Sequence, residues 1–404
     1  MNKMNNYQKP FSLKALDSEF NLVSLITYSS LQWTRKYHEV GQFSVVIDAR
    51  QYSSNWKYIY TEQRKELGVI SQINYQKEEY TSKITLSGYF LESELNKMIV
   101  YPLPTQFDDD SGTHYGTSLL KNQGLPTWLG KEGTADIVAR DFFNGFKKIA
   151  WRNYQVGDFE GNTIVTSTHE LDIQFGSIES GDYKHSAHNR NGEYLGNKLY
   201  DILNESGASI EVLYNHLTRK KTLNIIHGKD RTAEQTDPTI NPMILSTRNG
   251  TVTGASVVKS NTAEKDALIQ YSSSDDLTLV LVNEKPDSIG RFMIQNMSAN
   301  QGDYIKDDTP DKAKADKEHK LAVLSDAVDK LYENRAKLNL DFDTIQGSFR
   351  YMIDYDLGDK ISVEVPEIDL SVDVQIIACR EVVEKGVWKM SFELGTPLKI
   401  RKRG

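Results

Sequence analysis

The sequence contains a single cysteine, Cys379, among its 404 residues. One thiol cannot form a disulfide framework within the chain. Its neighbours Ile376, Ile377 and Ala378 are apolar, which predicts a buried thiol on a β-strand rather than a nucleophile. So few cysteines are typical of a protein assembled in a reducing cytoplasm.

Long apolar runs are also missing. No stretch approaches the roughly 20 apolar residues that a membrane-spanning helix requires. The first eleven residues are polar and contain no apolar segment of the kind found in signal peptides. We therefore expect a chain that is synthesised in the cytoplasm and has no membrane span.

Positive charge is in the minority. The chain has 48 Lys and Arg against 56 Asp and Glu, a formal net charge of -8. General nucleic-acid binding needs clustered cations that neutralise phosphates, so this composition argues against it. The basic residues 399–403 are too few to reverse the balance, and we expect them to form a solvated terminus.

Signatures of catalysis are equally scarce. The sequence contains no nucleophile elbow, phosphate-binding loop or zinc-protease motif. His185 and His188 have a spacing that suits a metal site on a helix, but residues 177–192 around them predict a surface loop. Carboxylate pairs for glycoside hydrolysis cannot be identified, because their required spacing is spatial. We predict no catalytic residue, no metal ligand and no cofactor.

Residues that favour β-strands are abundant. There are 21 tyrosines, and Thr, Val and Ile recur in short runs. Ile84 and Leu86 alternate with polar residues, and so do Trp388, Met390 and Phe392. This period of two predicts strands with one buried and one solvent-facing side. The sequence therefore predicts a mainly β protein with α+β insertions.

Helical periodicity marks three segments. They are residues 134–149, residues 195–206 and residues 309–337. Thr134 is placed to cap the first helix, and Pro310 suits the first turn of the third. The third segment either packs on its own domain or forms a short coiled coil between subunits, and its brief apolar seam favours the first alternative.

Two hairpins resemble each other in pattern. Residues 69–90 and 374–395 each run strand, charged turn, strand, and each follows a short strand that begins with glycine, at 41–47 and at 358–365. Either the chain contains an internal duplication or the likeness is common to antiparallel hairpins. The domains we predict are a first β barrel (1–104), an α+β insertion (105–208), the first part of a second barrel (209–258), an insertion with helix 309–337 (259–340), and the closing strands of the second barrel (341–404).

Several stretches, taken together and in order, resemble one family. They are residues 31–37 and 41–45, 64–70, 228–232, 249–250, 355–361, 380–382 and 392–397. In this order they are similar to the tail-associated hub proteins of siphophages and prophages of Gram-positive bacteria, which are similar in plan to the central hub of contractile tails. The motif positions that the resemblance marks as structural are Trp33, Arg35, Gly41, Phe43, Glu66, Leu67, Gly68, Asp230, Tyr355, Leu357, Gly358, Asp359, Gly395 and Pro397.

The resemblance implies a structural protein of the virion tail tip or baseplate. Each subunit would carry two tail-tube-like antiparallel β barrels side by side, and a homotrimer would adapt a sixfold tail tube to a threefold tip. Its partners would be the distal tail protein ring, the tape-measure protein and other tail-tip or receptor-binding proteins, with DNA only as transiting cargo during genome ejection. Because the chain stops soon after Pro397, we expect the hub core alone, without an appended enzyme.

Two other readings remain open. A tail-tip enzyme that degrades cell wall, either a peptidase or a glycosidase, would clear Gram-positive walls. A secreted carbohydrate-binding β protein would be a monomer that retains glycans, and the missing signal peptide counts against it. In a hub, an acidic channel would repel DNA and limit its adhesion during transit.

Overall fold

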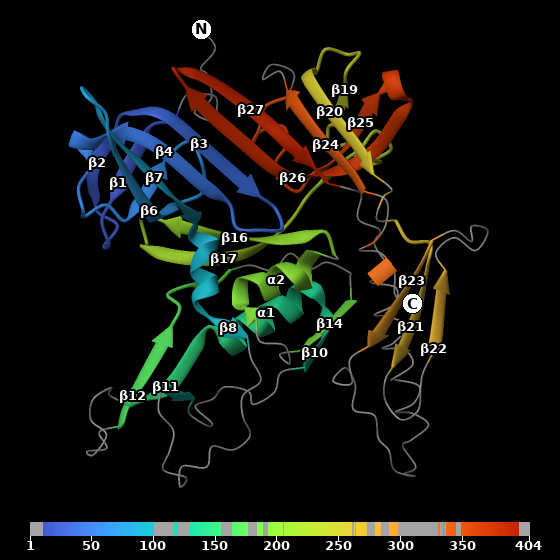
Figure 1. The fold of residues 1–404 in the computed structure, drawn as a ribbon, viewed down its shortest axis with the longest axis horizontal. Helices are drawn as coiled ribbons and strands as arrows, with labels where there is room; N and C mark the ends of the chain where they lie inside the picture. The colour runs from blue at the N-terminus through green and yellow to red at the C-terminus, as the bar shows by residue number, and fades with distance from the viewer. Residues whose placement is uncertain are drawn as a thin grey trace. The chain divides into compact units, whose positions relative to one another are not determined.

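The computed structural model describes residues 11–100, 117–119, 130–154, 164–176, 184–188, 193–204, 206–260, 262, 264–272, 279–283, 291–297, 330–331, 334, 337–344 and 349–395. The chain divides into two units (Figure 1). The first combines residues 1–255 with residues 341–404, and the second is Ser256–Leu340. Pro397 lies outside the described residues.

The first β module is the N-terminal part of the first unit. Its strands are β1 (Leu13–Leu16), β2 (Leu22–Ile26), β3 (Tyr28–Lys36), β4 (Gln42–Asp48), β5 (Tyr58–Thr61), β6 (Gly68–Lys77) and β7 (Ser82–Phe90). They pair in the order β2-β1-β5-β6-β7-β4-β3. Only Thr27 separates the first strand of this path from the last, so the chain itself joins the two ends.

A glutamine side chain stabilises this one-residue break. The amide oxygen of Gln51, in the short helix η2 (Ala49–Gln51), accepts from the backbone N–H of Thr27 at 3.0 Å. Its amide nitrogen donates to the Thr27 carbonyl, also at 3.0 Å. Both backbone groups that leave the strand ladder are thereby satisfied.

One aromatic-rich core fills the first β module. Trp33, Phe43 and Phe90 are buried in it, with ring centroids of Trp33 and Phe90 4.7 Å apart. Ile84 and Leu86 also point into this core, which confirms the period-two prediction for β7. The wide rings are accommodated because glycines lie beneath them: a Cβ on Gly68 would come within 2.5 Å of the Phe43 ring.

The second β module follows in the C-terminal half of the sequence. It contains β18 (Asp230–Arg231), β19 (Ile244–Ser246), β20 (Val252–Ser260), β24 (Lys337–Thr344), β25 (Lys360–Val365), the short helix η5 (Pro366–Ile368), β26 (Leu370–Glu384) and β27 (Val387–Leu394). β20 and β24 are the strands by which the chain enters and leaves the second unit.

A single long strand joins the two β modules. Residues 370–375 of β26 pair with β25, and residues from 376 onward pair with β27 on one side. On the other side, residues 378–384 pair antiparallel with β3 of the first β module. The resulting path runs β2-β1-β5-β6-β7-β4-β3-β26-β27-β24-β20 (Figure 1).

The prediction of a mainly β chain with α+β segments is confirmed. The path through the described strands is open at β2 and at β20, so hydrogen-bonded closure of either barrel is not detected among them. The two barrels of the resemblance therefore remain a prediction.

An α+β layer packs beside the first β module. It contains the short helix η3 (Leu91–Lys97), α1 (Ala135–Phe146), α2 (Leu195–Asn204) and the hairpin β16 (Ala208–Asn215) with β17 (Lys220–His227). Short strand pairs complete it: β8 (Ile99–Val100) with β15 (Glu193–Tyr194), β10 (Gly130–Thr134) with β14 (Lys184–His188), β13 (Gln174–Phe175) with β17, and β11 (Lys148–Tyr154) with β9 (Thr117–Leu119) and β12 (Ile164–Glu170).

The predicted helices 134–149 and 195–206 correspond to α1 and α2. Thr134 does occupy the N-cap position of α1, although its side chain forms no capping bond. The helix ends earlier than predicted, and Ile149 lies in β11, because strand pairing with β12 begins at Lys148.

The predicted loop at residues 177–192 is wrong for its middle part. His185 and His188 lie on β14, which pairs with β10, because the backbone there finds strand partners that the sequence pattern does not reveal.

The second unit contains a three-stranded sheet. Its strands are β22 (Leu279–Asn283), β21 (Ala267–Ser272) and β23 (Phe292–Met297), paired in that order. Leu268 and Leu331 are fully buried against each other. The predicted helix 309–337 lies almost entirely outside the described residues. In the described part of the chain, every helix is too short or too polar to cross a membrane.

Candidate functional site

The junction of the two β modules brings together residues that lie more than 300 positions apart in the sequence. At its centre, Trp33 of β3 lies opposite Glu381 of β26 in the strand register. Cys379 lies on the same strand and is fully buried, as predicted, and burial raises the pKa of its thiol well above the usual value. A continuous sheet with buried charges therefore connects the modules.

One buried ion pair spans the junction. The Arg64 guanidinium donates through Nε to Glu381 at 2.6 Å, and a second nitrogen contacts the other carboxylate oxygen. Both side chains are only 1% exposed. Trp388 of β27 donates its indole N–H to the same carboxylate at 3.1 Å. Such a bidentate pair, removed from water, fixes the relative position of its partners geometrically.

A second charged cluster lies beside the first. Arg35 of β3 contacts the carboxylate of Glu66 and donates to Asp356 at 2.9 Å. Lys65 donates to the other oxygen of Asp356 at 3.0 Å. Burial opposes ionisation of Asp356, but the charges of Arg35 and Lys65 outweigh it and lower its pKa to about 2. Trp33 completes the cluster by donating to Glu66 at 3.3 Å.

The turn at residues 355–361 anchors the second β module on the end of β3. Gly358 has φ +92 and lies directly against the Tyr37 ring, so a side chain at this position would be strained and would overlap the ring. The Tyr37 hydroxyl accepts from the Gly228 N–H at 3.1 Å and lies 3.0 Å from the Ile226 carbonyl. The glycine, predicted as a motif position, is thus required by backbone conformation and by close approach.

Asp359, next to this glycine, organises the backbone around it. One carboxylate oxygen accepts from the N–H of Lys229 at 2.7 Å. The other accepts from Arg231 at 2.6 Å and from the N–H of Asp356 at 3.0 Å. Asp359 is 3% exposed, so these bonds form away from bulk water. Its role is to hold the turn and β18 together.

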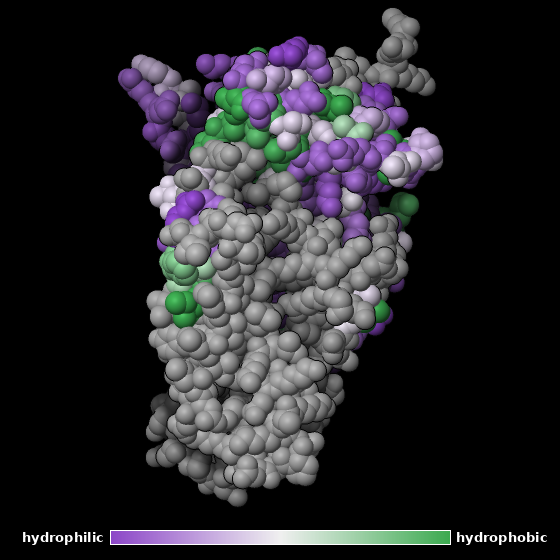
Figure 2. All heavy atoms as spheres, turned by 90° about the vertical axis from the view of Figure 1, so that its right-hand side faces the viewer, coloured by the Kyte–Doolittle hydropathy of each residue, from purple (hydrophilic) through white to green (hydrophobic). Residues whose placement is uncertain are grey.

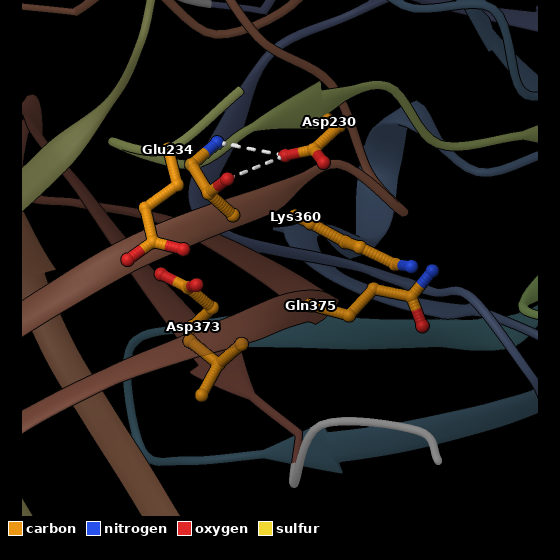
Figure 3. Close-up of a pocket in the computed structure, with 7 residues that line it drawn as sticks. Asp230, Glu234, Lys360, Asp373 and Gln375 are labelled. Carbon is orange, nitrogen blue, oxygen red and sulfur yellow. Dashed lines mark hydrogen bonds between the residues drawn. The ribbon is translucent and has the colours of Figure 1, made fainter. Parts of the chain in front are cut away.

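A polar cavity opens next to this turn. It has a volume of about 400 Å³ and is lined by Asp230, Thr232, Glu234, Lys360, Asp373, Val374 and Gln375. In Figure 3, the side chains of Glu234 and Asp373 point toward one another, while Lys360 points toward Gln375.

The polar groups of this cavity are engaged locally. Asp230 accepts from the N–H and the hydroxyl of Thr232, at 2.9 and 2.8 Å (Figure 3). Asp373 accepts from Ser362 at 2.5 Å. Among the described residues, no group of three or more His, Cys, Asp or Glu side chains is arranged to hold a metal ion. The bonds to Asp230 are local to the end of β18, and the bond between Ser362 and Asp373 links β25 to β26.

The predicted motif positions fall into three groups. Trp33, Arg35 and Glu66 meet in the charged junction, and Tyr355 is buried against Phe392. Gly358, Asp359 and Leu357 form the anchoring turn, and Asp230 lies at its edge. The remaining described positions, Gly41, Phe43, Leu67, Gly68 and Gly395, lie in or against the packed cores.

Sequence reasoning missed the strongest pair of the junction. Glu381 lies midway between Cys379 and Val383, which are both buried on β26. The period of two therefore places Glu381 on the buried side, and a carboxylate there requires a buried cation. That signal was present in the sequence, but it does not identify Arg64 as the partner.

Comparisons with known proteins identify phage proteins as similar to this chain. A family model described as "Siphovirus ReqiPepy6 Gp37-like protein" matches residues 12–114 and 152–396. No curated protein matches the chain.

Solved structures share the fold at low sequence identity. The tail protein from Neisseria meningitidis MC58 is 11% identical with a TM-score of 0.55, and the match covers 96% of this chain and 97% of that one. The 43 kDa tail protein of prophage MuSo2 from Shewanella oneidensis is 10% identical with a TM-score of 0.53, again covering 96% and 97%.

Proposed function

Since this chain belongs to the siphovirus ReqiPepy6 Gp37-like protein family and has the fold of phage tail proteins, we propose that it is the structural hub of a tail tip or baseplate. Three copies form a ring that meets the sixfold tail tube above and the threefold tip below. The ring closes the distal end of the tail and opens, or is displaced, when the tape-measure protein and DNA leave.

The observation that carries this proposal is a repeated strand order. The first β module contains β6-β7-β4-β3, with β5 paired to β6. The second contains β26-β27-β24-β20, with β25 paired to β26. Two similar modules in each subunit give six in a trimer, which is what a threefold ring needs to match a sixfold tube.

The repeat supports the internal duplication but changes its alignment. The sequence pattern compares residues 41–47 with residues 358–365. In the sheet, however, β4 pairs with the second strand of its hairpin, whereas β25 pairs with the first strand. By position, β25 corresponds to β5, and β4 corresponds to β24. The glycine at the start of the strand gave the wrong alignment, because strands in both positions of the module begin after a turn.

The junction explains how one subunit keeps its two modules in fixed register. A hub that transmits a signal from tip to tube needs rigid neighbours, and the buried Arg64–Glu381 pair provides a geometrically defined connection. We propose the distal tail protein ring and the tape-measure protein as partners, with other tail-tip or receptor-binding proteins. Assembly takes place in the host bacterial cytoplasm, and the final location is the virion tail tip.

The mass of the purified full chain in solution tests this proposal. Light scattering coupled to size exclusion should give three times the 45.9 kDa of one chain. Incubation with tails that lack this protein should place it at the tail tip in electron micrographs. A strict monomer that never associates with tails would overturn the hub. Clearing of Gram-positive cell walls by the purified chain would replace it with an enzyme.

A further inference from the structure

The outer part of β6 is an uncovered strand. All seven residues from 71 to 77 are exposed, on both sides of the strand. β5 pairs with β6 only at Gly68 and Val69, so the described residues provide no further strand on this edge. Such an edge presents a row of backbone donors and acceptors that favours pairing with another strand.

Apolar side chains on this strand are uncovered as well. Ile73 is 47% exposed and Tyr75 is 56% exposed. Their cross-strand partners on β7 are Leu86 and Ile84, which are 0% and 6% exposed. Directly opposed residues share one face of a sheet. The row of core-facing side chains therefore continues onto β6 but is left open to solvent there.

The equivalent strand of the second β module is covered. β26 has a register irregularity between Ile376 and Ala378, and β6 has one between Ile70 and Gln72. In both hairpins, the part before this irregularity pairs with the short strand of the same module. The part after it leads to the turn. On β26 that part pairs with β3, and four of its seven residues are buried.

The strand order identifies what would cover β6. β3 ends the series β6-β7-β4-β3, and it covers β26 of the neighbouring module within the chain. The counterpart of β3 is β20, which ends the series β26-β27-β24-β20 and has no further neighbour among the described strands. On β20, Ala255 and Ser256 are exposed and Val258 is 54% exposed. Figure 2 shows the face that lies on the right of Figure 1, where hydrophobic side chains gather among hydrophilic ones.

We propose that β20 of one copy pairs with residues 71–77 of β6 in the next copy, repeating between subunits the β3–β26 pairing seen within one. The contact is head-to-tail, so each copy offers one free edge and accepts another. The number of subunits, three, is taken from the proposed ring, so this inference rests on the proposed function. In the closed ring, every module would have its outer hairpin strand covered, and neither edge would remain open to uncontrolled pairing.

A pair of lysine variants tests which surface holds the assembly. Tyr75→Lys places a charge in the row of apolar side chains that β20 would cover. Tyr89→Lys is the matched control, because Tyr89 is on β7 of the same hairpin and is similarly exposed, at 48%, but on the opposite face. Light scattering on the full chain should show a threefold drop in mass for Tyr75→Lys and none for Tyr89→Lys. Unchanged circular dichroism spectra for both would show that the monomer fold is intact.

Cysteine pairing tests which strands meet. Asn74→Cys is combined with Ala255→Cys, Ser256→Cys or Val257→Cys in turn, since one register should bring the two sulfurs within bonding distance. Mild oxidation should give a ladder that ends at the trimer for at least one pair. The native Cys379 is fully buried and does not compete.

The outcomes separate this inference from the function on which it rests. A wild-type trimer that survives Tyr75→Lys, or that gives no ladder in any register, would overturn the β6–β20 contact and leave the hub intact. Dimers from Asn74→Cys alone would also overturn it, because they would show β6 pairing with itself. A wild-type monomer would remove the trimeric hub and this contact together.

Discussion

Removing one charge of the buried Arg64–Glu381 pair should weaken the fold strongly. Glu381→Gln keeps the shape of the side chain but removes the charge that the Arg64 guanidinium contacts at a site that is 1% exposed. Breaking a buried pair in this way costs about 3 to 5 kcal/mol, since the remaining ion cannot be rehydrated. We expect a loss near the lower end of this range, because the glutamine oxygen still accepts one hydrogen bond.

The double variant Arg64→Met with Glu381→Leu is the comparison in which both charges are removed. Replacing both charges by apolar side chains of similar size removes the desolvation cost of both, and such replacements are often neutral or stabilising. The double variant should therefore be more stable than Glu381→Gln alone. The difference reflects the penalty of keeping the Arg64 charge buried without that of Glu381, rather than the value of the pair.

Urea unfolding followed by tryptophan fluorescence provides the assay, because Trp33 and Trp388 both donate hydrogen bonds to carboxylates of the junction. The surface pair Lys14–Glu62, at 2.5 Å, supplies the control. Glu62 is 61% exposed, and Glu62→Gln should leave the unfolding midpoint unchanged. Equal midpoints for Glu381→Gln and Glu62→Gln would show that the junction does not depend on its buried charges.

Three further predictions concern single sites. Gly358→Ala should lower the free energy of unfolding in urea by about 2 to 4 kcal/mol, because the new methyl group would be strained in the left-handed region and would overlap the Tyr37 ring. The control is Gly386→Ala, which has φ +77 and open space around it and should cost only about 1 kcal/mol. Equal losses for the two variants would refute the overlap. Burial raises the pKa of Glu92 from 4.5 to about 7, so the folded state holds its proton more tightly and stability should fall by about 3 kcal/mol as the pH rises from 4.5 through 7. Glu92→Gln should flatten that fall in thermal melts taken across the range, and an unchanged profile would assign it to other groups. Gln51→Ala removes both hydrogen bonds to the break between β2 and β3 and should cost about 1 kcal/mol, unless water replaces them fully.

Local sequence patterns predict many of the strands and helices but not the pairing of strands that lie far apart in the sequence. The alternation around Ile84 and Trp388 predicted both outer hairpins, and the apolar stripe after Thr134 predicted α1, because these signals depend on neighbours a few residues away. The pairing of β3 with β26 depends on residues some 350 positions apart, and no local period reports it. Its only sequence trace is the charge of Glu381 at a position where the pattern requires an apolar side chain.

The resemblance marked the motif positions, whereas the structure gives a physical reason for several of them. Gly358 allows a backbone conformation with positive φ, Asp359 accepts hydrogen bonds from backbone N–H groups, and Arg35 is the centre of a charge cluster. Spacing alone does not distinguish these roles. The same limit explains why the uncovered half of β6 was not foreseen, since exposure on both faces is a property of missing neighbours rather than of the strand itself.

Because β26 is shared by both modules, β3 must wait for its partner strand during synthesis. Gln32 of β3 and its partner Arg380 are 348 residues apart. At about 5 to 20 residues per second, the ribosome needs about 20 to 70 s to deliver that partner after β3 has emerged. During this interval the edge of β3 that β26 will cover is open, in the same way as β6. A nascent chain therefore carries one more open strand than the finished subunit. Only after β26 has been synthesised and has paired with β3 are the edges of β6 and β20 the ones left for other subunits.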